Sequence, residues 1–248
     1  MPSKILSSNS LSLQTAQKLT VIKQGLHQRP PIADKQALLE SIRQIGLLQL
    51  DTVSVVARSH YLVMLSRVGL YNPADLDALL YPDRCLFQQW AHAICLIPTE
   101  DYGYFAPVIQ ARRKREHGRL KRLGENPQAV LDEVLNEIKE RGPLASRDFK
   151  DSGDGQRNWW DWKPAKIALD ILFTQGYLMV DRRVNFQMYY DLAERVLPAS
   201  STPPSKTVDD WRRWATLRSV SCLGVATAQH ASDYYRQKIP TTRTLLNT

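Results

Sequence analysis

The order of helical and strand-like segments between residues 128 and 190 constrains the fold of this chain more than any other feature. Residues 128–141 carry apolar side chains at the spacing of an amphipathic helix, and Gly142-Pro143 follows directly. We expect a short helix at 146–149, a longer one at 163–174, and then two strands. Three helices followed by a hairpin are the elements of a winged helix-turn-helix.

The strands of this hairpin are predicted at 177–180 and 184–190. Asp181-Arg182-Arg183 would then form its tip. A basic hairpin tip can contact the phosphate backbone of DNA.

The N-terminal half resembles the beginning of a second such module. Apolar positions predict a helix over 37–45, which Gly46 ends, and a short strand at 47–51. Further helices are predicted at 55–69 and 72–80. Helix, short strand and further helices are the order in which a winged-helix module begins.

We therefore predict a mainly α fold with short β-hairpins, organised as tandem winged-helix modules. The expected modules are residues 10–124, residues 125–198 and, after a linker at 198–204, the start of an incomplete third module at 205–248. The last twelve residues, 237–248, are predicted to be a tail.

The charge of the chain favours a polyanionic partner. The 248 residues contain 33 Lys and Arg against 25 Asp and Glu, for a formal net charge of +8. Residues 110–122 alone hold seven basic residues and one acidic one. Such a run is either a DNA-contacting surface or simply a solvated helix face.

Several other classes of protein have no support in the sequence. No apolar run approaches the roughly 20 residues that span a bilayer, and the first residues lack the apolar core of a secretory signal. Three widely spaced cysteines suggest a reducing compartment. We expect a cytoplasmic, nucleoid-associated monomer that uses no metal, no cofactor and no membrane.

Gln49 and Asp51 are the candidate catalytic pair. In a strand, side chains two positions apart point to the same face, so Leu48 and Leu50 would face the core while this pair faces outward. A carboxylate beside an amide can hold and deprotonate a water molecule, and can stabilise a cationic sugar. The alternative interpretation is an exposed polar pair on an edge strand.

His60, His92 and Trp90 allow a structural and a functional interpretation. Neither histidine belongs to an HxxxH or HExxH pattern or has a cysteine partner, so a metal site is not expected. A lone histidine near an apolar helix is commonly structural, and Trp90 is more often a core residue than a platform for base stacking.

Five blocks of sequence, in their order, carry a resemblance to a known family. They are ALLESIRQIGLLQLDTVSVVARSHYLVMLSRVG, LLYPDRCLFQQWAHAICLIP, RGPLASRDF, WWDWKPAKIALDILFTQGYLMVDRR and NFQMYYDLAERVLP. The chain resembles the YcaQ-like crosslink-repair DNA glycosylases, a winged-helix family. The resemblance covers most of residues 10–198 and continues more weakly to about 236.

The resemblance implies a catalytic role for Gln49-Leu50-Asp51, which matches the family's motif of Gln, an apolar residue, and Gln or Asp. Asp51 would activate the water that attacks C1′ of the sugar, and Gln49 would orient it. The substrate would be double-stranded DNA carrying N7-alkylated purines, including interstrand crosslinks. The residues that we predict to bind DNA are Arg58, His60, Arg67, Trp90, His92, Arg112, Arg113, Lys114, Lys163, Lys166, Arg182 and Arg183.

The chain departs from the family pattern at Ala93, where an acidic residue is expected, and at Met188, where an arginine is expected. Family members also extend beyond residue 248, so we expect a C-terminally truncated copy. Two alternatives to a glycosylase remain at this point. One is a non-catalytic winged-helix DNA-binding protein or transcriptional regulator, and the other is an inactive truncated glycosylase copy.

Overall fold

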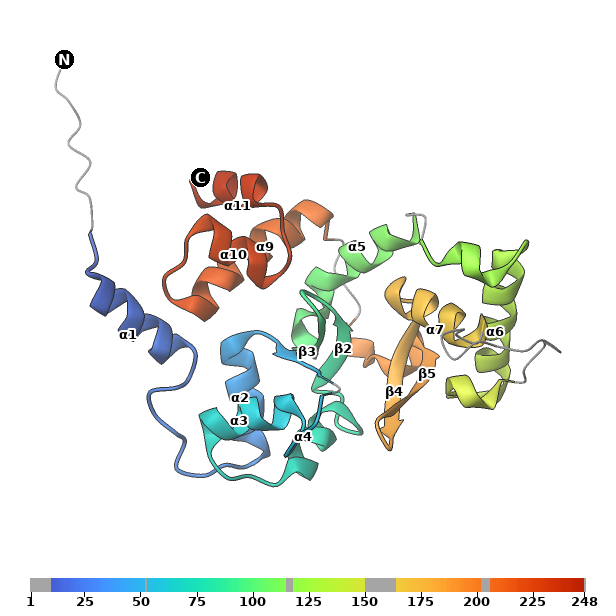
Figure 1. Cartoon of the computed structure of the whole chain (residues 1–248), viewed down its shortest axis with the longest axis horizontal. Coiled ribbons are helices and arrows are strands. Elements are labelled where there is room, and N and C mark those ends of the chain that lie inside the picture. Colours follow the sequence, from blue (N-terminus) through green and yellow to red (C-terminus); the bar gives the residue numbers. More distant parts are fainter. Residues whose placement is uncertain (1–9, 52, 115–117, 150–163, 202–205, 248) are drawn as a thin grey trace, which may run out of the picture.

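The computed structural model describes residues 10–51, 53–114, 118–149, 164–201 and 206–247. The fold is mainly helical and contains two small antiparallel sheets. Strands β2 (Leu86–Trp90) and β3 (Ile94–Pro98) lie near the middle of the molecule, with N-terminal helices on one side and a second helical unit on the other (Figure 1). No helix in these ranges is long and apolar enough to cross a membrane.

The N-terminal helices begin and end where the sequence provides caps. Asp34 accepts a hydrogen bond from the backbone N–H of Ala37 at the start of α2, and Gly46 ends that helix in the left-handed conformation. Asn72 caps α4 in the same way as Asp34. The helices of this unit are α1 (Leu13–Lys23), α2 (Lys35–Ile45), α3 (Ser59–Val68) and α4 (Pro73–Leu80).

Strand β1 (Leu48–Gln49) pairs with β3, so the sheet has the order β1-β3-β2. Gln49 lies opposite Cys95, and the Leu50 N–H donates to the Ile94 carbonyl over 2.8 Å. Leu48 is 2% exposed and Leu50 packs on the same core cluster, as the predicted alternation requires. The predicted strand at 47–51 is therefore present, but its regular part is only two residues long.

The second unit follows α5 (Tyr102–Arg113) and confirms most of the element order predicted for 128–190. Helices α6 (Pro127–Arg141) and α7 (Pro164–Thr174) pack on the hairpin of β4 (Leu178–Val184) and β5 (Gln187–Leu192). The predicted middle helix is a single 3-10 turn, η3 (Ser146–Asp148). Short turns complete this region: η1 (Thr99–Asp101), η2 (Leu120–Leu123) and α8 (Ala193–Val196).

The predicted hairpin tip is wrong. Residues 181–183 belong to β4, and the turn is formed by Asn185 and Phe186, whose φ angles are 50° and 66°. Two consecutive left-handed residues suit the twist of a two-residue hairpin turn, and asparagine tolerates that conformation. Asp181 lies within β4, where Arg84 pairs with its carboxylate at 2.6 Å.

The C-terminal segment is mainly helical as far as Leu246. After η4 (Ala199–Ser201) come α9 (Val208–Leu223), α10 (Ala228–Tyr234) and α11 (Ile239–Leu246). The tail predicted at 237–248 is wrong, because Thr242 of α11 is fully buried. In Figure 1 these helices lie above α2 and beside α5. Trp214 and Tyr235 make edge-to-face ring contacts with Phe105 of α5 in a shared aromatic core.

Gly46, at the end of α2, lies close against the C-terminal helices. Its φ is +73°, and a Cβ atom there would lie 2.7 Å from the Tyr235 hydroxyl and 3.0 Å from the Cys222 sulfur. The site therefore demands glycine both for its backbone conformation and for space.

We predict that Gly46→Ala lowers the free energy of unfolding by about 3 kcal/mol, from left-handed strain of about 1–2 kcal/mol together with overpacking. Gly25→Ala is the matched control, because its φ of +68° is similar but its nearest neighbour is 3.4 Å away. The control should lose about 1–2 kcal/mol in urea titrations analysed with a common slope. Equal losses in the two variants would contradict the close approach.

Candidate catalytic pair and nucleic-acid interface

Gln49 lies on the exposed face of β1, beside the tight turn that joins β2 and β3. His92 of that turn reaches it, with 3.2 Å between His92 Nε2 and Gln49 Oε1. The other ring nitrogen, Nδ1, lies 3.2 Å from the Tyr234 carbonyl oxygen at the end of α10. Because a carbonyl oxygen only accepts, the Nδ1–H donates to it, and in the neutral ring Nε2 then accepts from the Gln49 side-chain amide, turned so that its NH2 group faces the ring. His92 thus ties the Gln49 amide to the backbone of the C-terminal helices.

The same turn is held from a second direction by Arg236, whose Nε lies 3.5 Å from the His92 carbonyl oxygen. Arg236 itself has a φ of +54° and pairs with Asp233 at 3.2 Å. The C-terminal unit therefore helps to position a residue that contacts Gln49.

Asp51 lies just beyond the strand and is half-buried. Its Oδ1 accepts the backbone N–H of Val53 over 2.9 Å, and an isolated bridge pairs Ser54 with Arg58. The carboxylate is therefore held at the start of the segment that leads into α3.

The tip of the β4–β5 hairpin packs against the start of α3. The guanidinium carbon of Arg58 lies 3.5 Å from the centre of the Phe186 ring, and that of Arg183 lies 4.3 Å from it. Arg183 also donates to the Phe186 carbonyl and to Gln88 Oε1, each over 2.9 Å. These cation–π contacts stabilise phenylalanine in a left-handed conformation that it rarely adopts.

His60 is 3% exposed, so its side chain is part of the interior, and its DNA contact stays an untested prediction. Its ring lies 6.3 Å from Phe186 and stacks with it. Burial lowers the pKa of His60 to about 4, helped by the charges of Arg183 and Arg58, while the Asp51 charge acts in the opposite direction. His60 is a neutral packing residue beneath the cluster of Phe186 with its two arginines.

Arg67 and Trp90 also have mainly structural positions. Arg67 is half-buried and donates to the Val63 carbonyl at 3.0 Å and to Gln24 of the α1 region at 3.3 Å. Trp90 is half-buried and packs against the core of the second unit. The Arg67 Nε and Trp90 Nε1 atoms are buried, and the DNA contacts of these two residues stay predictions.

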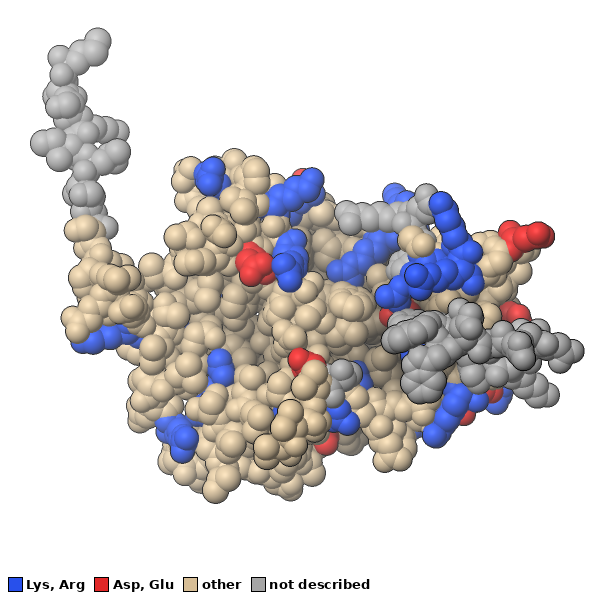
Figure 2. Space-filling model, in the orientation of Figure 1, with Lys and Arg blue, Asp and Glu red and all other residues tan. Residues whose placement is uncertain are grey.

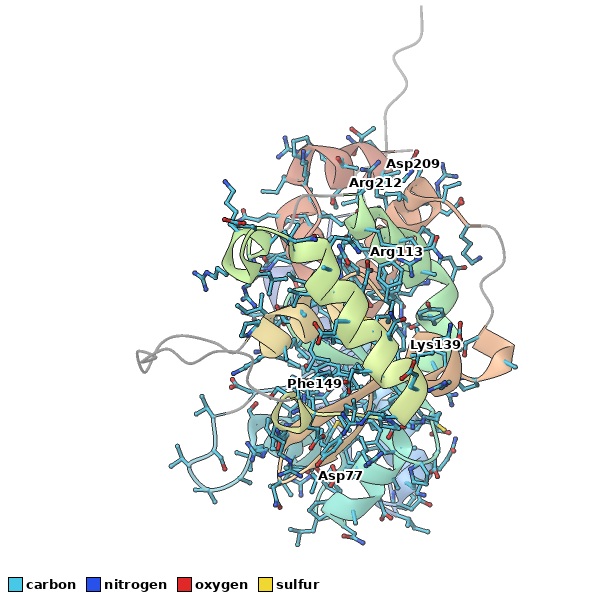
Figure 3. The ribbon with its side chains drawn as sticks, turned by 90° about the vertical axis from the view of Figure 1, so that its right-hand side faces the viewer. Asp77, Arg113, Lys139, Phe149, Asp209 and Arg212 are labelled. Atoms are coloured by element: carbon cyan, nitrogen blue, oxygen red, sulfur yellow. The ribbon has the colours of Figure 1, made fainter. Side chains whose placement is uncertain are left out.

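Arg112 and Arg113 anchor α5 to its neighbours. Arg112 donates to the Trp90 carbonyl at 3.1 Å, and Arg113 donates to the Gln175 carbonyl at 2.9 Å while its guanidinium lies over the Tyr177 ring. Figure 3 shows Arg113 on α5 above Lys139 on α6, and both line a cavity of about 600 Å³ between these helices. Arg113 is nevertheless exposed at one side.

Lys114, Lys166 and Arg182 are exposed, as DNA-contacting residues must be. Arg182 pairs with Asp181 at 2.7 Å and lies over the Tyr189 ring. The predicted contact Lys163 lies outside the described residues. In Figure 2, Lys and Arg gather over the end of α5 and the segment that leads to α6.

An aromatic cavity of about 430 Å³ lies beside the β2–β3 turn. Four cations line it together with two tryptophans: Arg112, Arg212, Arg236, Lys238, Trp90 and Trp211. Positive charge thus surrounds the turn that carries His92.

The mainly helical fold is similar to that of the Streptomyces sahachiroi DNA glycosylase AlkZ, with a TM-score of 0.67 and 14% sequence identity to this chain. The match covers 96% of this chain and 65% of that one. A family model described as DNA glycosylase AlkZ-like matches residues 42–248, and the chain belongs to this family.

Phe186, Tyr234 and Arg236 adjoin the candidate site but were not predicted from the sequence. Phe186 follows Asn185, whose tolerance of left-handed geometry could have located the turn. Tyr234 acts through its backbone carbonyl, for which the side-chain identity carries no signal. Arg236 reaches the site only through the packing of α10 on the rest of the fold.

We predict that His60→Gln removes part of the acid sensitivity of folding. Because the folded pKa of His60, about 4, lies below its unfolded value, the unfolded state binds the proton first as pH falls below about 6.5. The wild type should lose roughly 2 kcal/mol more than the variant between pH 7.5 and 4.5.

The measurement is urea unfolding of both proteins across this pH range. Asp101, whose pKa burial raises to about 6, acts in the opposite sense but is common to both proteins. A constant difference in unfolding free energy between them would disprove the assignment of His60 as a buried neutral residue.

Proposed function

We propose that this protein is a DNA glycosylase in which Gln49 and Asp51 hydrolyse the N-glycosidic bond of an N7-alkylated purine. One observation carries the proposal: in a chain of the AlkZ-like family, the exposed Gln49 amide is fixed by His92 next to a half-buried carboxylate. The alternative, an incidental polar pair on an edge strand, does not account for His92, which connects Gln49 to the backbone of Tyr234 in α10.

The proposed reaction uses each member of this set differently. Asp51 removes a proton from a water molecule, and its charge stabilises the cationic sugar that develops as the base departs. Gln49 holds the water by its amide. His92 is a positioning residue, since it contacts Gln49 and the Tyr234 carbonyl. The water oxygen then bonds to C1′ as the C1′–N9 bond breaks.

The proposed leaving group explains why no strong general acid is required. Alkylation at N7 gives the purine a positive charge, so the base departs as a neutral molecule when it takes the bonding electron pair. The substrate class therefore includes N7-alkylated purines in double-stranded DNA and, because Gln49 is exposed, bulky adducts such as interstrand crosslinks.

We also propose tandem winged-helix modules, at 10–124 and 125–198, with 205–248 belonging to a third. The order α2, β1, α3, α4 and the β2–β3 hairpin supports the first, and α6, η3, α7 and the β4–β5 hairpin support the second. The hairpin tip of the second module is docked on Arg58, so Arg182 on the strand, rather than the tip, is the proposed backbone contact. We propose that the protein binds DNA as a monomer.

The second candidate function is DNA binding without catalysis. The basic run at the end of α5 and the exposed Arg182 favour it, because a hairpin and a basic surface suffice for a regulator.

We predict that Asp51→Asn lowers the rate of base release from a duplex with one N7-methylguanine by at least about 100-fold. Affinity for the duplex should change little, since the asparagine Oδ1 still accepts the Val53 N–H. Released 7-methylguanine is measured chromatographically under single-turnover conditions, and binding by fluorescence anisotropy.

Asp209→Asn is the control, because Asp209 lies at the start of α9 with its side chain 82% exposed, and it should retain the wild-type rate. Binding by the wild type without any base release would reject the glycosylase in favour of the second candidate. Equal rates for Asp51→Asn and wild type would reject Asp51 as the catalytic residue.

We predict that Arg182→Gln weakens DNA binding irrespective of sequence and reduces the slope of log affinity against log salt by about 1. Arg141→Gln, which removes a surface arginine paired with Glu137 on α6, should leave the slope unchanged. Titrations at several salt concentrations distinguish the two variants. An unchanged slope for Arg182→Gln would place the phosphate contacts elsewhere.

A further inference from the structure

Three valines project from the loop that holds Asp51. Val53, Val55 and Val56 are 64%, 92% and 90% exposed. The Asp51 carboxylate accepts the Val53 N–H over 2.9 Å, and the Ser54–Arg58 bridge closes the loop below Val55 and Val56. The valines are thus presented at the apex of a closed loop that begins at the catalytic carboxylate.

Adjacent exposed valines differ from the isolated apolar residues found on every protein surface. Leu70 is also 90% exposed, but its neighbours Gly69 and Tyr71 are buried and half-buried. Contiguous exposed apolar side chains indicate a contact surface, because the hydrophobic effect penalises leaving them in water.

The charges beside this loop identify the kind of molecule that covers it. Arg58 forms the other side of the Ser54 bridge, and Arg183 lies with it on the Phe186 ring. Apolar side chains on a loop that an arginine closes suit duplex DNA, in which stacked bases lie between two rows of phosphates. Proteins that bend DNA insert such apolar wedges between adjacent base pairs and contact the phosphates with cations.

We propose that Val55 and Val56 form a wedge that enters a base step of duplex DNA and unstacks it beside the nucleotide attacked at Asp51. This inference rests on the proposed function for the choice of DNA as ligand. Its physical role is to open the duplex locally. C1′ of one nucleotide then comes within reach of the Asp51 carboxylate, which lies at the start of the same loop. Full extrusion of the base is not required.

The test uses duplexes with 2-aminopurine at successive positions around one N7-methylguanine. The fluorescence of 2-aminopurine rises when it is unstacked. Protein with Asp51→Asn should raise it at least threefold at one base step, and adding Val55→Ser and Val56→Ser should abolish the increase. Leu70→Ser in the same background is the matched control and should leave the increase intact.

The valine substitutions are also made with Asp51 present. Because the two valines are exposed, the double variant should fold normally, bind DNA within about tenfold of the wild type, and release the methylated base at least tenfold more slowly. Unchanged fluorescence and rate in the double variant would overturn the wedge while leaving the glycosylase standing.

Other outcomes separate the wedge from the proposed function. If the wild type releases no base yet valine-dependent unstacking occurs, the wedge is supported and the glycosylase fails. If sedimentation shows a wild-type dimer that the valine substitutions dissociate, the loop is a contact between copies of this chain and the wedge is wrong. Absence of any DNA binding overturns both.

Discussion

The pairing of the short strand β1 with β3 is the interaction on which the rest of the structure depends. It adds a third, edge strand to the β2–β3 hairpin, with Gln49 opposite Cys95. One further hydrogen bond, from the Leu50 N–H to the Ile94 carbonyl, extends the pairing. Leu48 is buried by this pairing and Gln49 is exposed by it, because successive residues of a strand face opposite sides. Where the pairing stops, the chain turns outward and carries Asp51 into its loop.

Buried polar contacts of the central hairpin join this N-terminal unit to the others. Gln89 is fully buried and donates to the Phe173 carbonyl at 3.3 Å, and Gln88 accepts from Arg183 of the β4–β5 hairpin. A buried amide without a partner would be costly, so these contacts favour one arrangement of the units. The same arrangement brings Phe186 onto Arg58 and the carbonyl of Tyr234 onto His92.

Local sequence signals predicted the helices at 37–45 and 72–80 closely. Caps at Asp34 and Asn72 and the left-handed Gly46 mark helix ends that depend on adjacent residues only. The β2–β3 hairpin was not predicted, because Leu86–Trp90 is buried on both faces and shows no alternation of apolar and polar residues. The hairpin tip was predicted at 181–183 because three consecutive charged residues are typical of a turn. These residues lie in β4 instead, where Arg84 from a distant segment pairs with Asp181.

The sequence by itself determined a mainly helical chain with a basic surface, and it placed Gln49 and Asp51 two positions apart beside a short strand. These properties follow from side-chain chemistry and from periodicity over a few residues. Only the tertiary structure decided that His60 is a buried neutral residue, that Phe186 lies on Arg58, and that His92 connects Gln49 to Tyr234. Each of these contacts joins segments far apart in the chain, and burial, which local patterns do not encode, decides which side chains remain free to act.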